Sequence, residues 1–296
     1  MQLSQRPTEV AVTWPEALVT EIAERRCVVI LGAGASADCV DADGEAPPTW
    51  SELLLGAAGK FLAGRPEMDD FNAYMVKELL LEAAEVIVEC AYPADYSEYL
   101  RDALGRHPYT IGRIYEQIVK LDARVNVSTN FDEILDNYCR NQGQGQPYSV
   151  IQYYEPNAIR ELRSRRRLVL KAHGSVCDTG KLVLTRLQSY RARREHPRFF
   201  ELLHALFLTN SLLFVGHSLR DPDLQLLLES VHMASQDTFP HYALVPGGRP
   251  AVEKKIVGET YNLHLLEYDA GQHCQASDAL ADLADQVESY RAAHPD

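Results

Sequence analysis

The 296-residue sequence has few of the features that would tie a protein to zinc or to a membrane. Its six cysteines stand at positions 27, 39, 90, 139, 177 and 274, and no two of them form a Cys-x-x-Cys pair. We therefore expect no zinc site. The chain has no apolar run approaching the roughly 18 residues of a membrane span, and no signal-peptide pattern. We expect a cytoplasmic protein with reduced thiols.

Basic charge is also scarce, because the formal net charge is −13. Binding to nucleic acid requires a basic surface that neutralises phosphates, so we expect no direct nucleic-acid partner. Two arginine clusters, at 163–167 and 191–194, fit solvated faces better than a binding patch. The remaining composition, 46% hydrophobic and 24% charged, is typical of globular domains.

What the chain does contain is a buried strand pattern at 27–31, followed by the turn Gly32-Ala-Gly-Ala-Ser36. A strand without polar residues suits the centre of a parallel sheet. Gly32 and Gly34 would allow a tight turn and close approach of a ligand. Backbone N–H groups of the turn and the Ser36 hydroxyl would then cradle an anion at the start of a helix, such as a nucleotide pyrophosphate. A turn that binds no ligand is the alternative.

The chain after this turn departs from a standard dinucleotide-binding unit. That unit returns to a second strand, ending in an acidic residue, within about 30 residues. Here an acidic segment with Pro47-Pro48 follows instead, and 51–121 is helical by pattern. Residues 38–50 are a candidate mobile loop that closes over a cofactor. The pattern indicates a nucleotide-binding sheet of another family.

Strands and helices alternate along the rest of the chain. We expect further strands at 124–128, 168–172, 181–184, 211–215, 241–245 and 263–268. We expect helices at 15–25, 51–91, 96–104, 110–121, 131–140, 186–208, from 222, and at 276–292, with a flexible loop at 143–147. This alternation predicts an α/β fold: a Rossmann-like parallel sheet with helices on both faces. It would form a single domain over 1–296, with a helical insertion at 51–121.

Polar or glycine-containing segments follow four of the predicted strands, at 32–36, 128–132, 173–175 and 216–221. In an open parallel sheet, ligands bind beyond the carboxyl ends of the strands. Each segment alone could be a cap or a turn. Four such segments on one rim favour a binding site over a purely structural explanation.

These segments carry a resemblance to a known family. The set Gly32-Ala-Gly-Ala-Ser36, Thr129-Asn-Phe-Asp132, His173-Gly174 and Gly216-His-Ser218 resembles the Sir2 (sirtuin) family, and most of all the bacterial Sir2-like proteins of phage-defence systems. The resemblance implies the sirtuin fold and NAD as the ligand. It implies cofactor-binding roles for Gly32, Ala33, Gly34, Ser36, Thr129, Gly216 and Ser218, with the first four on the NAD phosphates. It implies that Asn130 and His173 are catalytic, and that Asp132 contacts the nicotinamide amide or braces its pocket.

The chemistry of these side chains suits cleavage of the nicotinamide–ribose bond, which passes through an oxocarbenium-like state. Asn130 can donate and accept hydrogen bonds without carrying charge. Histidine has an ordinary pKa near neutrality, so His173 can take a proton from water or a ribose hydroxyl. A structural His173 is the alternative. Asp132 could equally cap the helix expected from Phe131.

One departure from the family bears on the reaction. Protein deacylases of the family carry a four-cysteine zinc module after the His-Gly element, and here that interval contains only Cys177. The resemblance therefore implies an NAD hydrolase that forms ADP-ribose and nicotinamide and depletes NAD during phage infection. A protein deacylase, an ADP-ribosyltransferase and a non-catalytic NAD- or ADP-ribose-binding scaffold are the alternatives.

The resemblance also bears on partners. No separate sensor domain is recognisable, so regulation would come from homo-oligomerisation or from another protein. A HerA-type ATPase is the leading partner that the resemblance implies, and an Argonaute-type protein is the alternative.

Overall fold

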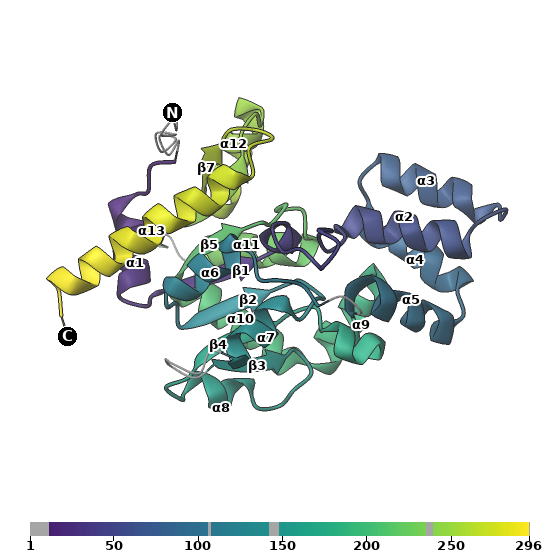
Figure 1. The fold of residues 1–296 in the computed structure, drawn as a ribbon, viewed down its shortest axis with the longest axis horizontal. Coiled ribbons are helices and arrows are strands. Elements are labelled where there is room, and N and C mark those ends of the chain that lie inside the picture. The colour runs from purple at the N-terminus through teal and green to yellow at the C-terminus, as the bar shows by residue number, and fades with distance from the viewer. Residues whose placement is uncertain (1–11, 106–107, 142–147, 235–238, 296) are drawn as a thin grey trace, which may run out of the picture.

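A seven-stranded parallel sheet forms the centre of the molecule in the computed structural model, which describes residues 12–105, 108–141, 148–234 and 239–295 (Figure 1). The strand order is β3-β4-β2-β1-β5-β6-β7. The strands are β1 Cys27–Leu31, β2 Val125–Ser128, β3 Tyr148–Gln152, β4 Arg167–Lys171, β5 Ser211–Val215, β6 His241–Pro246 and β7 Leu263–Tyr268. Every ladder in this sheet is parallel. The predicted α/β fold is confirmed.

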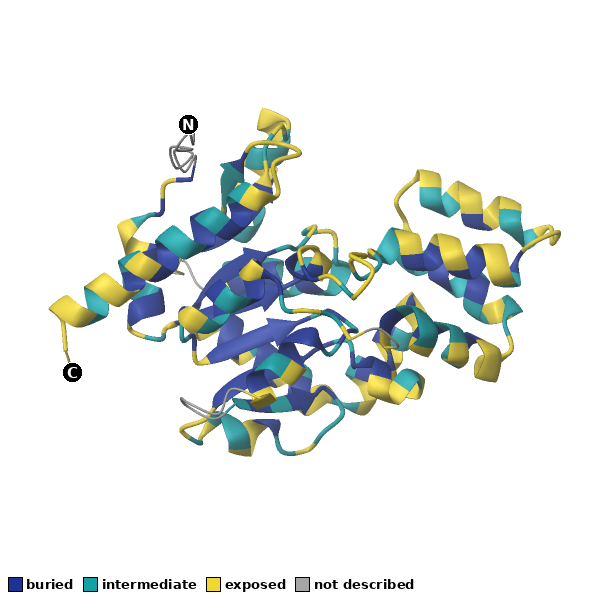
Figure 2. Ribbon diagram, in the orientation of Figure 1, coloured by how far each residue is buried: buried dark blue, intermediate teal, exposed yellow. Residues whose placement is uncertain are grey.

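Helices cover both faces of the sheet, and the alternating side chains of β1 show why. Cys27, Val29 and Leu31 join one buried cluster, whereas Val28 and Ile30 join another. The first cluster includes side chains from α1 Glu16–Ala23, α6 Arg113–Lys120, α7 Ile134–Asn141 and α13 Cys274–Ala293. The second includes side chains from α8 Ala158–Leu162, α9 Arg186–Glu195, α10 Pro197–Thr209, α11 Pro222–Ala234 and α12 Ala251–Tyr261. The central strands β1, β2, β4 and β5 are therefore buried on both sides, and Figure 2 shows the middle of the sheet in the colour of buried residues.

Four helices between β1 and β2 form a separate layer beyond one end of the sheet (Figure 1). They are α2 Trp50–Phe61, α3 Glu67–Val76, α4 Leu80–Cys90 and α5 Pro93–Gly105. Leu54, Phe71 and Ile87 are fully buried in their common core, which also takes in Leu182 and Leu184. These helices occupy part of the segment 51–121 that was predicted as a helical insertion. The predicted domain limits stay a prediction.

Some elements differ from the sequence expectations. The expected helix at 51–91 is three helices, because Gly64 takes a positive φ of 74° before Pro66 and Glu78 takes one of 56°. The expected helix at 186–208 is divided at His196, where Pro197 starts the next helix. The helix expected at 131–140 begins at Ile134.

The expected strand at 181–184 is wrong. The chain there makes the end of a short 3-10 element, η2 Val176–Lys181, and then an irregular segment packed on the four helices. Conversely, the sequence analysis did not predict β3, α8 and α12. The expected flexible loop at 143–147 lies outside the described residues.

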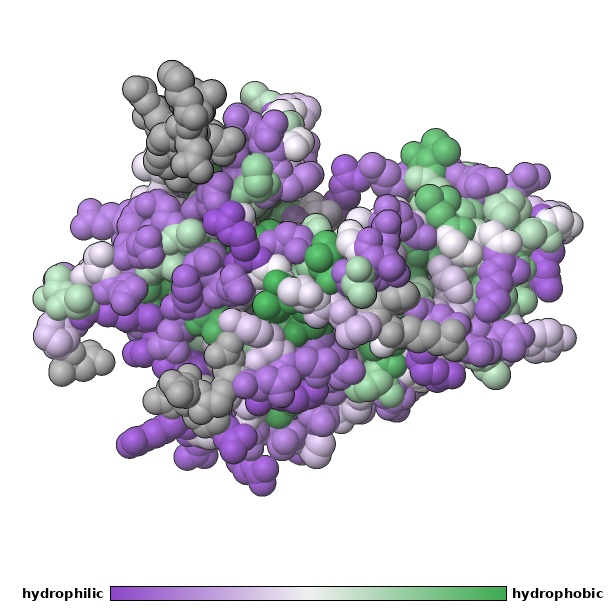
Figure 3. Space-filling model, in the orientation of Figure 1, coloured by the Kyte–Doolittle hydropathy of each residue, from purple (hydrophilic) through white to green (hydrophobic). Residues whose placement is uncertain are grey.

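Hydrophilic side chains cover most of the face seen in Figure 3, in keeping with the acidic composition.

Candidate functional site

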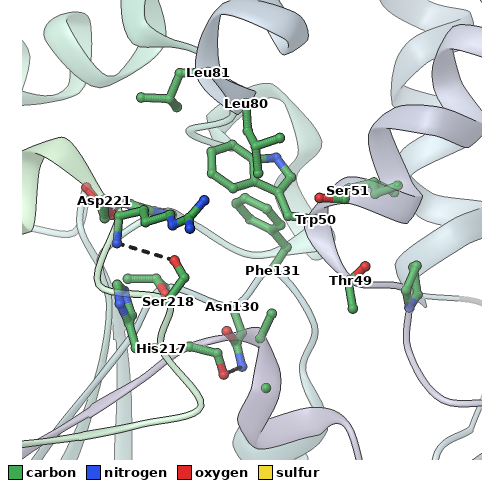
Figure 4. A pocket seen from close by; sticks show the side chains of 18 of the residues that line it. Thr49, Trp50, Ser51, Leu80, Leu81, Asn130, Phe131, His217, Ser218 and Asp221 are labelled. Atoms are coloured by element: carbon green, nitrogen blue, oxygen red, sulfur yellow. Dashed lines mark hydrogen bonds and ion pairs between the residues drawn. The ribbon is translucent and has the colours of Figure 1, made fainter. Parts of the chain in front are cut away.

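A cavity of about 550 Å³ lies between the carboxyl ends of the central strands and the layer of α2–α4 (Figure 4). This volume is within the usual range of small-molecule sites, roughly 300–1,000 Å³. One wall is formed by the segments that follow β1, β2, β4 and β5, and the other by residues 47–53 and 75–82. Strand β1 lies between β2 and β5 in the sheet, so the cavity sits where the strand order reverses.

All ten residues predicted for the site line this one cavity. They are Gly32, Ala33, Gly34, Ser36, Thr129, Asn130, Asp132, His173, Gly216 and Ser218. Four segments far apart in the sequence therefore meet at one place. The chemical role of each residue stays a prediction.

The glycine turn differs from the expected anion cradle at the start of a helix. Residues Ala33–Ser36 make a single 3-10 turn, η1. The Gly34 N–H donates to the carbonyl of Gly216 at 2.9 Å, and the Ala35 N–H donates to the carbonyl of Gly32 at 2.9 Å. Two of the N–H groups expected to hold an anion are therefore bonded within the protein.

The glycines permit two loops to touch. A Cβ on Gly32 would lie 2.6 Å from the carbonyl oxygen of Gly216, and a Cβ on Gly34 would lie 2.9 Å from the same atom. Gly216 itself has a φ of 64°, and a Cβ there would lie 2.1 Å from the nitrogen of Ala35. The turn after β1 and the loop after β5 thus pack backbone against backbone, which only glycine allows.

Asn130 is held by its amide nitrogen. The residue is 5% exposed, and Nδ2 lies 3.0 Å from the carbonyl of Gly32, 2.9 Å from the hydroxyl of Tyr115 and 3.1 Å from the hydroxyl of Ser36. The Gly32 carbonyl can only accept, so the nitrogen must face it. The buried Oδ1 then has no hydrogen-bond donor within the described residues. Oδ1 is therefore the unpaired acceptor of the Asn130 side chain.

Asp132 is 7% exposed, and both of its carboxylate oxygens are engaged. Oδ2 accepts from the Ser36 hydroxyl at 3.0 Å. Oδ1 accepts from the N–H of Ile134, the first residue of α7, at 3.1 Å. The capping alternative is therefore realised, on a helix that begins three residues later than expected, and the same carboxylate also fixes Ser36.

A buried ion pair lies next to this turn, and the sequence reasoning missed it. Lys171 and Asp136 have side chains that are each 1% exposed, with Nζ 3.3 Å from the Asp136 carboxylate. The Lys171 ammonium also donates to the carbonyl of Asp132 at 2.6 Å. A lysine within the otherwise apolar run 168–172 was the signal in the sequence that could have revealed it.

His173 is paired with Asp221, the last residue of the polar segment 216–221, to which the sequence analysis gave no role. His173 Nε2 lies 3.2 Å from the Asp221 carboxylate. Burial lowers the pKa of His173, but the charge of Asp221 and the hydrogen bond to it raise the pKa more, so that it lies above its ordinary 6.5. Burial raises the pKa of Asp221, yet His173 holds it well below its usual range.

Three further residues complete the rim. His217 Nδ1 accepts from the N–H of Leu219 at 3.0 Å, and burial lowers the pKa of His217 to about 4, so this ring stays neutral near pH 7. The Thr129 hydroxyl donates to the carbonyl of Leu31 at 3.1 Å. The Ser218 hydroxyl accepts from the N–H of Arg220 at 3.3 Å.

The opposite wall is largely apolar and comes from the helical layer. Trp50 and Leu80 line it, and Phe131 faces them from the sheet side (Figure 4). Trp50 starts α2, which is fixed by a capping box between Thr49 and Glu52. The Trp50 indole N–H is buried and has no acceptor in the described part of the chain. Residues 47–50, from the predicted cofactor loop, thus reach the cavity.

Exposed ion pairs join the two walls. Arg220 on the rim pairs with Glu78, and Arg186 at the start of α9 pairs with Glu82 on α4 at 2.8 Å. Across the described residues, no group of three His, Cys, Asp or Glu side chains is arranged to hold a metal ion. Within the same ranges, no helix is long and apolar enough to cross a membrane.

The sequence is similar to a known family and to two characterised proteins. Residues 124–266 match the family model of the SIR2-like domain. Defense-associated sirtuin 2 of Bacillus subtilis is 26% identical over 129 residues, which are 43% of this chain and 12% of that protein. The NAD(+) hydrolase ThsA of Acinetobacter baumannii (strain 532279) is 23% identical over 232 residues, which are 77% of this chain and 44% of that protein. The chain thus spans less than half the length of either relative.

Solved structures of Sir2 homologues also resemble the chain. One, a complex with NAD, has a TM-score of 0.48 at 12% identity and covers 94% of this chain and 96% of that one. Another, a mutant in complex with 2'-O-acetyl ADP ribose, has a TM-score of 0.43 at 12% identity, with 94% and 98% covered. The family match over 124–266 falls on β2 to β7 and on the segments that carry Asn130, His173 and Gly216. Residues 124–266 therefore resemble the SIR2-like domain, and the predicted Sir2-like resemblance is confirmed over this part of the chain.

Proposed function

We propose that this chain hydrolyses NAD at the nicotinamide–ribose bond, giving ADP-ribose and nicotinamide. The observation that carries the proposal is the convergence of Asn130 and the His173–Asp221 pair on one cavity at the carboxyl end of a Sir2-like sheet. The similarity to an NAD(+) hydrolase over 77% of the chain supports it.

In this reaction, water attacks the ribose carbon that bears nicotinamide. The carbon–nitrogen bond breaks, its electron pair neutralises the pyridinium ring, and the proton released by water goes to His173. Asp221 accepts a hydrogen bond from His173 Nε2, which leaves Nδ1 as the nitrogen that takes the proton. The Asp221 carboxylate then stabilises the imidazolium.

Asn130 and the apolar wall have separate parts in the same proposal. The Asn130 Oδ1 would accept a hydrogen bond from water or from a ribose hydroxyl, since it has no donor among the described residues. Trp50, Leu80 and Phe131 would shield the reacting bond from bulk water. Hydrogen bonds and charges act more strongly in such a shielded site.

The test is an assay of nicotinamide and ADP-ribose formed from NAD by the full chain. We expect His173→Ala and Asn130→Ala to lower the rate by roughly 10²–10⁴. His264→Ala, on the exposed side of β7, is the matched control and should leave the rate unchanged. If both site variants consume NAD like the wild type, the assigned pair is wrong. If nicotinamide release strictly requires an acylated peptide, the protein is a deacylase and the hydrolase proposal fails.

We further propose that NAD depletion by this chain serves defence against phage. The name of the Bacillus relative supports a role in defence, and the resemblance of the motifs supports phage as the target. The resemblance alone supports homo-oligomerisation and a HerA-type ATPase partner, with an Argonaute-type protein as the alternative. Mass measurement in solution, combined with NAD assays in the presence of each partner, tests these proposals. Cellular NAD that stays constant during infection of cells carrying the protein would contradict the defence role.

A further inference from the structure

Tyr115 lies outside the predicted site and yet contacts two of its residues. It belongs to α6, in the connection between β1 and β2, and is 1% exposed. Its hydroxyl is 2.8 Å from the Ser36 hydroxyl and 2.9 Å from Asn130 Nδ2. This one oxygen therefore joins the turn after β1 to the turn after β2.

The groups at the two ends of the hydrogen-bond chain through Tyr115 determine which atom donates in each bond. The Asp132 carboxylate accepts, so the Ser36 hydroxyl donates its proton to Asp132. The Ser36 oxygen is then free to accept from the Tyr115 hydroxyl, and the Tyr115 oxygen accepts from Asn130 Nδ2. The chain runs from the Asn130 amide through Tyr115 and Ser36 to Asp132, with each donor used.

Tyr115 keeps its proton in this position. Burial raises the pKa of Tyr115 well above its ordinary 10, and the charge of Asp132 adds to the effect. The phenol thus stays a donor throughout the physiological pH range. A hydrogen-bonded chain of this kind is cooperative, because each bond polarises the next.

We propose that Tyr115 is a positioning residue for Asn130. Its hydroxyl keeps the Asn130 nitrogen turned inward, so that Oδ1, the unpaired acceptor, is the atom left for a hydroxyl group of water or of the NAD ribose. The inference rests on the proposed function. It adds a residue that comes from outside the matched SIR2-like segment, since residue 115 precedes 124.

The variant Tyr115→Phe removes a single oxygen atom and keeps the buried ring. With the full chain and NAD, we expect kcat to fall about tenfold. This is the rate effect of losing the free energy of about one hydrogen bond that orients Asn130. KM should change little, because Tyr115 is not among the residues that line the cavity. The control is Tyr242→Phe on β6, another buried tyrosine away from the cavity, which should leave both constants unchanged.

A double-mutant cycle gives a readout that does not depend on turnover. The unfolding free energies of Tyr115→Phe, Asn130→Ala and the double variant should not add, because each change breaks the same hydrogen bond. Additive effects would overturn the inference. So would an active wild type with an equally active Tyr115→Phe variant. A wild type that consumes no NAD, alone or with its partner, would instead overturn the proposed function, and the positioning role with it.

Discussion

Lys171 and Asp136 form an ion pair of 3.3 Å with each side chain 1% exposed. Lys171 is the last residue of β4 and lies two positions before His173, while Asp136 is on α7. Because the same ammonium donates to the carbonyl of Asp132, it ties the strand that leads to His173 to the turn that carries Asn130. The two proposed catalytic residues thus share one buried support.

Breaking this pair should be costly. In Lys171→Met, Asp136 remains buried without its partner, and we expect a loss of about 3–5 kcal/mol of unfolding free energy. The double variant Lys171→Met/Asp136→Leu should recover much of that loss, because it leaves no unpaired charge. Urea unfolding monitored by circular dichroism measures both.

The pH dependence of the single variant provides its check. Burial raises the pKa of Asp136 and Lys171 lowers it, so removing Lys171 raises the pKa further. A carboxyl whose pKa is raised by folding destabilises the fold as pH rises through the unfolded value. Lys171→Met should therefore regain stability on acidification. A stability deficit that does not shrink at lower pH would contradict this account.

The His173–Asp221 pair predicts the pH profile of NAD hydrolysis. A proton acceptor must be neutral, so activity should rise with pH through a pKa above 6.5. Asp221→Asn removes the charge that raises this pKa, and the midpoint should move to lower pH. Asp278→Asn, which changes an exposed ion pair on α13, should leave the midpoint in place. An unmoved midpoint in Asp221→Asn would show that His173 is not the titrating group.

Two matched variants can distinguish the energetic cost of a side-chain clash between the glycine loops from the cost of backbone strain. Gly216 and Gly248 both have positive φ, 64° and 95°, but a Cβ on Gly248 meets nothing within 4 Å. We expect Gly248→Ala to cost about 1–2 kcal/mol from the backbone alone. Gly216→Ala should cost roughly a further 1–3 kcal/mol, because its Cβ collides with the turn after β1. Equal losses in urea unfolding would mean that the two loops separate easily.

Tryptophan fluorescence can report whether NAD enters the cavity. The sequence has two tryptophans. Trp50 lines the cavity, whereas Trp14 is buried elsewhere and donates to the carbonyl of Ala279 at 2.9 Å. ADP-ribose should change the emission of the wild type and of Trp14→Phe, but not that of Trp50→Phe. A response that persists in Trp50→Phe would place the ligand elsewhere.

The sequence predicted those parts of the molecule that local patterns determine. The strands at 27–31 and 211–215 contain the uninterrupted apolar runs 27–31 and 212–215, and their burial on both faces leaves little choice of structure. Strand β3, at the sheet edge, was missed because Tyr148–Gln152 mixes polar and apolar residues. Residues 182–184 looked like a strand because they are apolar, but the helical layer buries two of them.

The candidate site also contains residues that the sequence predicts and residues that only the folded structure reveals. Residues that follow predicted strands, such as Asn130 and His173, were assigned from their position along the chain and from the resemblance of their motifs. Tyr115, Lys171 and Asp221 were not assigned, because their importance comes from contacts across the fold. Tyr115, for example, lies 79 positions from Ser36 in sequence and 2.8 Å from it in space. No local pattern encodes such a contact.

The bond from the Gly34 N–H to the Gly216 carbonyl has a consequence for ligand entry. A phosphate that took this N–H would have to displace Gly216, whose loop leads within five residues to Asp221, the partner of His173. Occupation of the turn after β1 would then be transmitted to the imidazole through a single stretch of backbone. Binding of a phosphate at the turn after β1 would in this way change the position of Asp221, and with it the orientation of the His173 ring.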